Sequence, residues 1–248
     1  GQAISPSSLH GVTTVVMGNC GVGFAPCKTE DHDRLIRLME GVEDIPFPVL
    51  AQGLPWSWES FPDYLDFLAT RHFDTDVCAQ LPHAALRVFV MGDRGANRED
   101  ATPDDIAAMK QLAKEAVMAG AMGFSTSRTL NHRTSDGQPT PTLTASEAEL
   151  TGIGMGLSEA GRGVLQFVSD FDDLDKEFEI FRGLADGGDA PLSAGSPAGV
   201  PRPRPRRRRR RLRDHPGVRP AGALGMDGRM VRVQCPGHAR PADGAERG

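Results

Sequence analysis

The sequence has no run of about 20 continuous apolar residues, so it predicts no membrane-spanning helix. Cysteine is scarce, with 4 residues in 248, and lacks the paired spacing of a zinc ribbon or a redox motif. The first residues, Gly1-Gln2-Ala3-Ile4, show no basic-then-apolar region of the kind found in secretory signals. These absences favour a reducing compartment, and we expect a cytoplasmic protein.

Basic residues are unevenly distributed along the chain. Residues 1–185 hold 27 acidic and 14 basic residues, whereas residues 186–248 hold 6 acidic and 14 basic ones, all arginine. The second segment lacks Ile, Phe, Tyr, Trp, Lys, Asn and Thr, and it contains consecutive arginines from Arg206 to Arg211. Such a composition cannot bury enough apolar surface to offset chain entropy. We therefore predict a folded domain at 1–185 and a disordered tail at 186–248.

Two interpretations of this tail are open. The first is an arginine-rich arm that binds RNA, DNA or another anionic surface through phosphate contacts. The second is a slip of the reading frame near residues 183–190, because Arg, Gly, Pro and Ala dominate the tail and have GC-rich codons. The abrupt loss of periodicity favours the frame slip, so nucleic acid is not the expected partner.

The first segment alternates between strand and helix patterns. Runs of β-branched and apolar residues predict strands at 12–17, 76–81, 122–126 and 164–168, the first of them buried. Helical spacing and start signals predict helices that begin near residues 31, 60, 102 and 144, with a further one near 176–184. The start at Thr144 is interpreted as a capping box with Glu147. Strands separated by helices indicate an α/β fold with a parallel sheet.

One motif is specific. The run Met17-Gly18-Asn19-Cys20-Gly21 follows directly on the first predicted strand, and together they closely resemble the N-acyl-D-amino-acid deacylases, a branch of the metal-dependent amidohydrolases. Supporting segments of the same resemblance occur at 53–61, 83–87, 119–128 and 161–166. The resemblance fades near Arg182, so it covers the segment predicted to fold.

This resemblance implies part of a TIM-type (β/α)₈ barrel, with about four to five βα units in this chain. It also implies hydrolysis of a small-molecule amide, an N-acyl-D-amino acid, with zinc as the cofactor. In that mechanism zinc lowers the pKa of a bound water to about 7, and a carboxylate acts as general base. Cys20 matches the metal-ligand cysteine of the family, and zinc binds thiolate readily.

Several polar residues near the ends of predicted strands are candidates for substrate binding: His83, Ser125, Arg128 and His132. An arginine offers a bidentate fork for a substrate carboxylate. His83 can equally cap a turn, and an exposed arginine is usually only solvated. Ser169 and Asp170, after the fourth strand, are expected to line the site without an assigned role.

The sequence also departs from the family pattern. The family's His-x-His metal motif would lie just before Gly1, and the fourth strand ends without a histidine. The catalytic Asp, the general base, would follow the frame slip. Zinc needs three or four ligands, and only Cys20 is a firm candidate. We therefore expect no deacylase activity from this chain. Four or five strands cannot close a barrel, so we also expect an unstable, aggregation-prone chain.

The closest enzymatic alternative is a cyclic-amide hydrolase of the hydantoinase type, which shares the barrel. Those enzymes commonly bridge two metals with a modified lysine. None of the four lysines of this chain stands at the end of a predicted strand: Lys28, Lys110, Lys114 and Lys176. This observation disfavours the alternative.

Overall fold

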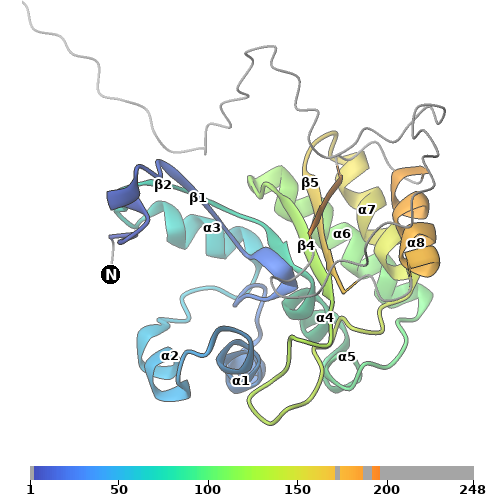
Figure 1. Ribbon diagram of the computed structural model, residues 1–248, viewed down its shortest axis with the longest axis horizontal. Coiled ribbons are helices and arrows are strands. Elements are labelled where there is room, and N and C mark those ends of the chain that lie inside the picture. Colours follow the sequence, from blue (N-terminus) through green and yellow to red (C-terminus); the bar gives the residue numbers. More distant parts are fainter. Residues whose placement is uncertain (1–2, 171–173, 187–191, 196–248) are drawn as a thin grey trace, which may run out of the picture.

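The computed structural model describes residues 3–170, 174–186 and 192–195. The described strands form two parallel sheets, a two-stranded one of order β1-β2 and a four-stranded one of order β3-β4-β5-β6. In Figure 1, β1 and β2 extend to the left, apart from β4 and β5. The strands are β1 (Thr14–Met17), β2 (Asp76–Ala79), β3 (Leu81–Pro82), β4 (Gly123–Arg128), β5 (Val164–Ser169) and β6 (Leu192–Gly195).

Helices connect most of the successive strands. The α-helices are α1 (His32–Glu43), α2 (Phe47–Gly53), α3 (Phe61–Ala69), α4 (His83–Met91), α5 (Asp93–Ala96), α6 (Pro103–Ala119), α7 (Glu147–Glu159) and α8 (Leu174–Asp186). Three short 3₁₀ segments precede α1, namely η1 (Ser8–His10), η2 (Asn19–Gly21) and η3 (Thr29–Asp31). Helices α6, α7 and α8 lie together on one side of the four-stranded sheet (Figure 1). The α/β fold with parallel strands is thus confirmed.

The core lies between the four-stranded sheet and the helices α3, α4, α6 and α7. Phe124 of β4 and Phe167 of β5 are fully buried and pack against Met109 of α6 and Ile153 of α7. Each such side chain contributes about 1.5–3 kcal/mol when it leaves water. The four-stranded sheet and its helices thus enclose the main core, and a second, smaller cluster, which includes Leu35 and Leu38, lies beneath α1.

The second predicted strand, at 76–81, is two strands in the structure. It divides at Gln80, so that β2 pairs with β1 and β3 pairs with β4. The Gln80 N–H donates to the Met17 carbonyl at 2.9 Å, and the next residues, Leu81 and Pro82, align with β4. This short segment therefore joins the two sheets, and it leads directly into α4.

Two local expectations are wrong. β1 is not buried: its residues are exposed or half-buried, and Val12 before it is 38% exposed, because β2 is the one described strand that pairs with it. The N-cap of α7 is Ser146, whose hydroxyl accepts from the Glu149 N–H at 3.2 Å. Thr144 instead donates its hydroxyl to the Arg98 carbonyl at 3.3 Å.

The predicted tail at 186–248 lies outside the described residues, apart from Asp186 and β6. Leu192–Gly195 pairs with β5 in parallel register, from Leu165 to Val168. The domain division at 185 stays a prediction, and so do the disorder of the tail and its origin in a frame slip.

Helix α6 supplies a test of the local fold. The Thr102 hydroxyl accepts from the Asp105 N–H at 3.2 Å, and the Asp105 carboxylate accepts from the Thr102 N–H at 2.8 Å. We predict that Thr102→Ala lowers the free energy of unfolding by about 1 kcal/mol, because it leaves helix N–H groups unpaired. Urea denaturation followed by circular dichroism measures this change. Thr102→Ser keeps the cap and should unfold like the wild type; an equal loss in both variants would contradict the assignment.

Candidate functional site

The residues after β1 form a tight turn that includes η2 and crosses the ends of β3 and β4. Gly18, Cys20 and Gly21 have φ angles of +82°, +58° and +71°, in the left-handed region that favours glycine. A Cβ on Gly18 would lie 2.4 Å from the carbonyl oxygen of Gln80, and one on Gly21 would lie 2.9 Å from the Cα of Thr126. Backbone packing therefore requires both glycines, which is a physical reason for the Gly-Asn-Cys-Gly motif.

Ser125 of β4 fastens this turn. Its hydroxyl accepts from the Gly21 N–H at 3.1 Å and donates to the Gly18 carbonyl. The Ser125 side chain is fully buried. A residue predicted to bind substrate thus has both of its hydrogen-bond partners in the turn that carries Cys20.

Cys20 itself is half-buried and forms no disulfide. Burial raises the pKa of its thiol, and the negative charge of Glu43 at the end of α1 raises it further. A nearby cation would favour the thiolate. Within the ranges that the structure describes, no three His, Cys, Asp or Glu side chains are grouped so that they could hold a metal ion. The described residues therefore offer one soft donor and not a complete ligand set.

The end of β4 brings further predicted residues together. The Nδ1 atom of His132 lies 3.3 Å from the Ser127 hydroxyl. Burial lowers the pKa of His132, while the charges of Glu43 and Asp170 act in the opposite direction. Glu43 is thus a charge that acts on the pKa of both Cys20 and His132.

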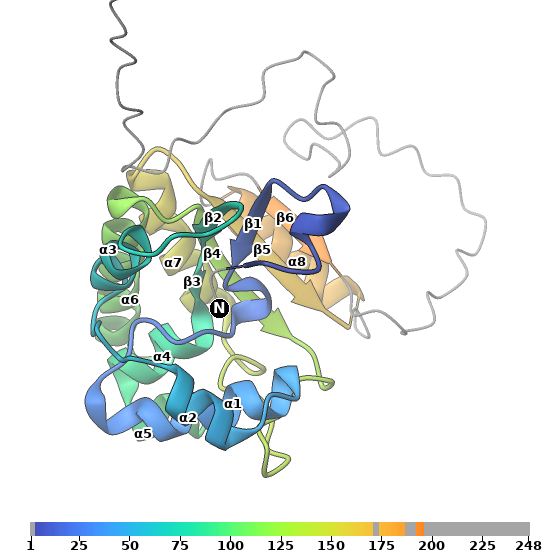
Figure 2. The ribbon, with the colours of Figure 1, turned by 90° about the vertical axis from the view of Figure 1, so that its left-hand side faces the viewer.

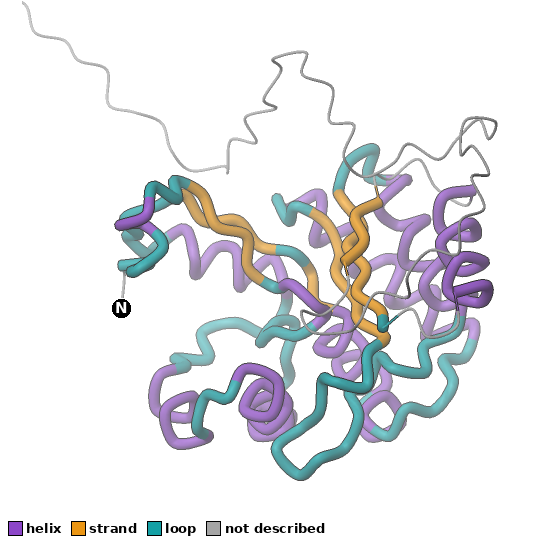
Figure 3. Tube along the Cα trace, in the orientation of Figure 1, coloured by secondary structure: helices purple, strands orange, loops and turns teal. Residues whose placement is uncertain are grey.

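Asp170 accepts hydrogen bonds from the first residues after β4. Its carboxylate accepts from the Thr129 hydroxyl at 2.5 Å and from the Leu130 N–H at 2.8 Å. The long loop that follows, residues 129–146, extends from the end of β4 on the side where α1 lies (Figure 3). The Ser135 N–H donates to the Arg37 carbonyl of α1 at 3.1 Å. The loop that carries His132 is thus held at both the sheet and α1.

Arg128 is not a solvated side chain. Its Nε donates to the Glu177 carboxylate of α8 at 3.1 Å, and its Nη1 donates to the Ala145 carbonyl at 2.5 Å. Only about a tenth of the Arg128 and Glu177 side chains is exposed. Ser169, the last residue of β5, is buried. Arg128 therefore links β4 to α8 and to the segment before α7.

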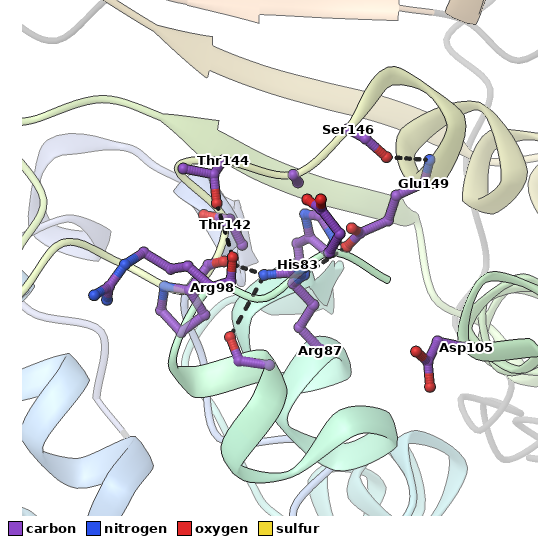
Figure 4. Close-up of polar contacts among 12 residues, drawn as sticks. His83, Arg87, Arg98, Asp105, Thr142, Thr144, Ser146 and Glu149 are labelled. Atoms are coloured by element: carbon purple, nitrogen blue, oxygen red, sulfur yellow. Dashed lines mark hydrogen bonds and ion pairs between the residues drawn. The ribbon is translucent and has the colours of Figure 1, made fainter. Parts of the chain in front are cut away.

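His83 belongs to a buried polar group at the start of α4 (Figure 4). Its Nε2 lies 2.8 Å from the Glu149 carboxylate, and its Nδ1 lies 2.8 Å from the Thr126 hydroxyl. Arg87, one turn along α4, donates from Nε to the same Glu149 oxygen at 2.7 Å. None of the His83 and Glu149 side chains is exposed, and 1% of the Arg87 side chain is.

The protonation of this group follows from its surroundings. Burial lowers the pKa of His83, although the hydrogen bond and charge of Glu149 oppose this effect. Burial alone would raise the pKa of Glu149, but its partners His83 and Arg87 keep that pKa below its ordinary value. Glu149 is therefore ionised opposite Arg87, and a neutral His83 donates from Nε2 to it. The second Glu149 oxygen has no hydrogen-bond partner among the described residues.

Sequence reasoning missed Arg87, Glu149 and Glu43. The spacing of Arg87 four residues after His83 on one helix was the available signal. Acidic residues are common in the first turn of a helix, so the sequence does not distinguish Glu149. Its partner Arg87 on α4 is 62 residues away in the sequence. No local sequence pattern predicts a contact between residues so far apart in the chain.

The sequence of the chain matches the model of the amidohydrolase family over residues 2–229. The chain belongs to the amidohydrolase family.

Characterised relatives within this family share one type of reaction. A D-aminoacylase of Alcaligenes xylosoxydans xylosoxydans is 37% identical over 123 residues, which are 50% of this chain and 22% of that protein. An N-acyl-D-aspartate deacylase of the same organism is also 37% identical over 123 residues, 49% of this chain and 22% of that protein. The match with this amidohydrolase chain therefore spans about a fifth of the length of these relatives.

Solved amidohydrolase structures agree with these relatives. A D-aminoacylase crystal structure superposes with a TM-score of 0.53 at 27% identity, covering 77% of this chain and 35% of that one. An N-acyl-D-glutamate deacylase from Bordetella bronchiseptica, in complex with zinc and a phosphonate inhibitor, gives 0.54 at 26% identity and covers 75% and 34%. The fold of the described residues is thus that of one section of these enzymes. In this section, no described helix is long and apolar enough to cross a membrane.

Two glycines near Cys20 allow the cost of a positive φ to be measured separately from the cost of a steric clash. Gly11 and Gly18 have φ angles of +84° and +82°, but a Cβ on Gly11 meets nothing within 4 Å. Gly11→Ala therefore measures the cost of the backbone conformation alone, about 1 kcal/mol. We predict that Gly18→Ala costs at least about 2 kcal/mol more in unfolding free energy, because Gln80 must also move. Equal losses in urea denaturation would contradict the close approach.

The buried histidine predicts a pH dependence of stability. The unfolded chain takes up a proton at His83 near pH 6.5, whereas the folded chain, whose His83 pKa is lowered, does not. Stability should therefore fall as the pH drops below about 6.5. We predict that His83→Gln reduces this slope by up to about 1.4 kcal/mol per pH unit. Urea denaturation at pH 7.5 and 5.5 tests this, with His10→Gln, at an exposed site, as the control; an unchanged slope in His83→Gln would refute it.

Proposed function

We propose that this chain is a section of an amidohydrolase that removes the acyl group from N-acyl-D-amino acids. The observation that supports this proposal is the agreement between relatives and solved structures. They include a D-aminoacylase and deacylases for N-acyl-D-aspartate and N-acyl-D-glutamate. The amide bond of a small N-acyl-D-amino acid is the common feature of these substrates. We also propose a cytoplasmic location and, for the whole enzyme, a (β/α)₈ barrel, to which the order β3-β4-β5-β6 would contribute.

Zinc is the metal that we propose for this enzyme, with Cys20 as one ligand. The position of Cys20 supports this role, since barrel active sites lie at the carboxyl ends of strands and Cys20 directly follows β1. The other ligands would have to come from outside the described residues. We therefore assign no catalytic step to the described side chains, and we propose that the 248-residue chain alone does not hydrolyse these substrates.

His132 is the substrate-binding residue that we propose among the four candidates. His83, Ser125 and Arg128 have internal partners at hydrogen-bond distance, with which they hold the fold together. His132 lies half-buried on the loop after β4, where its Nδ1 contacts the Ser127 hydroxyl at 3.3 Å. A half-buried, neutral imidazole there can donate to or accept from an amide or carboxylate of the substrate.

A chimera tests the reaction class. The 123 residues of the Alcaligenes D-aminoacylase that align with this chain are replaced by the matching residues of this chain. We predict that the zinc-loaded chimera releases amino acid from N-acetyl-D-amino acids and not from the L enantiomers or from hydantoins. Cys20→Ala in the chimera should lower kcat/KM by more than about a hundredfold, since even residues behind the ligands typically cost 10–100-fold.

The matched control is Cys78→Ala in the same chimera, because Cys78 is a buried cysteine of β2. It should leave the D preference unchanged. Hydrolysis of hydantoins by a folded chimera would favour the cyclic-amide alternative and overturn the proposal. Turnover by the isolated 248-residue chain would contradict its inactivity while confirming the reaction.

A further inference from the structure

A cavity of about 190 Å³ lies between the ends of β1 and β2, the chain after the Cys20 turn, and the helices α1 and α3. An apolar cavity of about 150 Å³ is already large enough to bind benzene. Most of the lining is apolar, including Met17, Met39 and Phe61. The cavity therefore has the size and the chemistry for a six-membered ring or a short branched chain.

Two polar side chains, Tyr64 and Gln80, interrupt the apolar lining. Gln80 is 8% exposed, and its Oε1 is buried without a hydrogen-bond partner in the part of the chain that the structure describes. Burying an amide oxygen without a partner is costly, so native proteins rarely leave one. An acceptor of this kind in the wall of a cavity is open to a donor from outside the described residues.

Two tryptophans contact Phe24, one of the residues that line the cavity. Phe24, which lines it, accepts a hydrogen bond at its carbonyl from Trp58 Nε1 at 2.7 Å. Trp56 packs edge-on against the Phe24 ring at 5.9 Å, and its own φ is +48°, a strained conformation for so large a residue. Strained residues of this kind concentrate at functional and ligand sites. Both tryptophans belong to the 53–61 segment, which contributes Phe61 to the lining, and they have no role in the proposed reaction.

We propose that this cavity binds a small apolar molecule or group with one hydrogen-bond donor, such as a phenol, an indole or a short amide. The apolar part fills the space between Met17, Met39 and Phe61, and the donor pairs with Gln80 Oε1. The site is separate from the proposed deacylase reaction and does not depend on it. A molecule bound in the cavity would lie next to the chain that carries Cys20, the metal-ligand candidate, because Gly18 and Val22 line the cavity and stand two residues before and after Cys20.

Phenol and toluene are the probes that test this proposal, since they share a ring and differ in the donor. They are titrated into the full chain with ¹³C-methyl-labelled methionine, and the methyl signals are followed by NMR. We predict saturable shifts at Met17 and Met39, and none at Met155, which is 42% exposed on α7. Shifts that do not saturate, or that are equal at Met155, would overturn the proposal.

Gln80→Leu then tests the hydrogen bond. It should weaken phenol binding by about fivefold or more, the usual value of one such bond, and leave toluene binding unchanged or tighter. Gln138→Leu, at an exposed position, is the control and should change neither affinity. Equal changes for both probes in Gln80→Leu would show that the amide binds only water, and this would refute the proposed ligand class. Gln80→Met gives the same comparison if Gln80→Leu does not fold.

Discussion

The buried ion pair between Arg87 and Glu149 is the interaction on which the arrangement of the helices depends. It places two opposite charges where none of Glu149 and 1% of Arg87 is exposed. Arg87 also donates to the carbonyls of Pro141 at 2.6 Å and Glu99 at 2.5 Å. One side chain thus connects α4, α7 and two loops. Charges in such a position are tolerated when they are paired, and removal of one partner typically costs about 3–5 kcal/mol. The pair defines how α4 and α7 meet, and His83 extends it to β4.

The turn at Gly18–Gly21 has the corresponding role on the other side of the sheet. It is held by backbone contacts and by Ser125, with little contribution from large side chains. Gln80 and Thr126 leave no room for a Cβ on Gly18 or Gly21, and Cys20 between them has a positive φ. The same Gln80 also contributes to the wall of the cavity beside the turn, so the two features share a residue.

Taken together, these contacts divide the conspicuous polar residues into two groups. His83, Arg87, Arg128 and Glu149 connect helices to strands and have internal partners. Cys20, His132 and Asp170 follow the ends of β1, β4 and β5 along the chain. The first group stabilises the part of the chain that the structure describes, and the second includes Cys20 and His132, the residues that we propose for the site. The second oxygen of Glu149 has no partner among the described residues, so the first group is not fully hydrogen-bonded.

The sequence by itself determined the alternation of strands and helices, most helix starts, and the family through the Met-Gly-Asn-Cys-Gly run. These features are local: β-branched runs, capping residues such as Thr102, and glycines in a turn act over a few residues. Only the tertiary structure decided that the second strand divides at Gln80, that β1 is half-exposed, and that Arg128 and His83 face internal partners. Those outcomes depend on contacts such as Arg87–Glu149 and Gly21–Ser125, which are separated by 62 and 104 residues. A pairing over such distances is set by how layers pack, and no periodicity in the sequence encodes it.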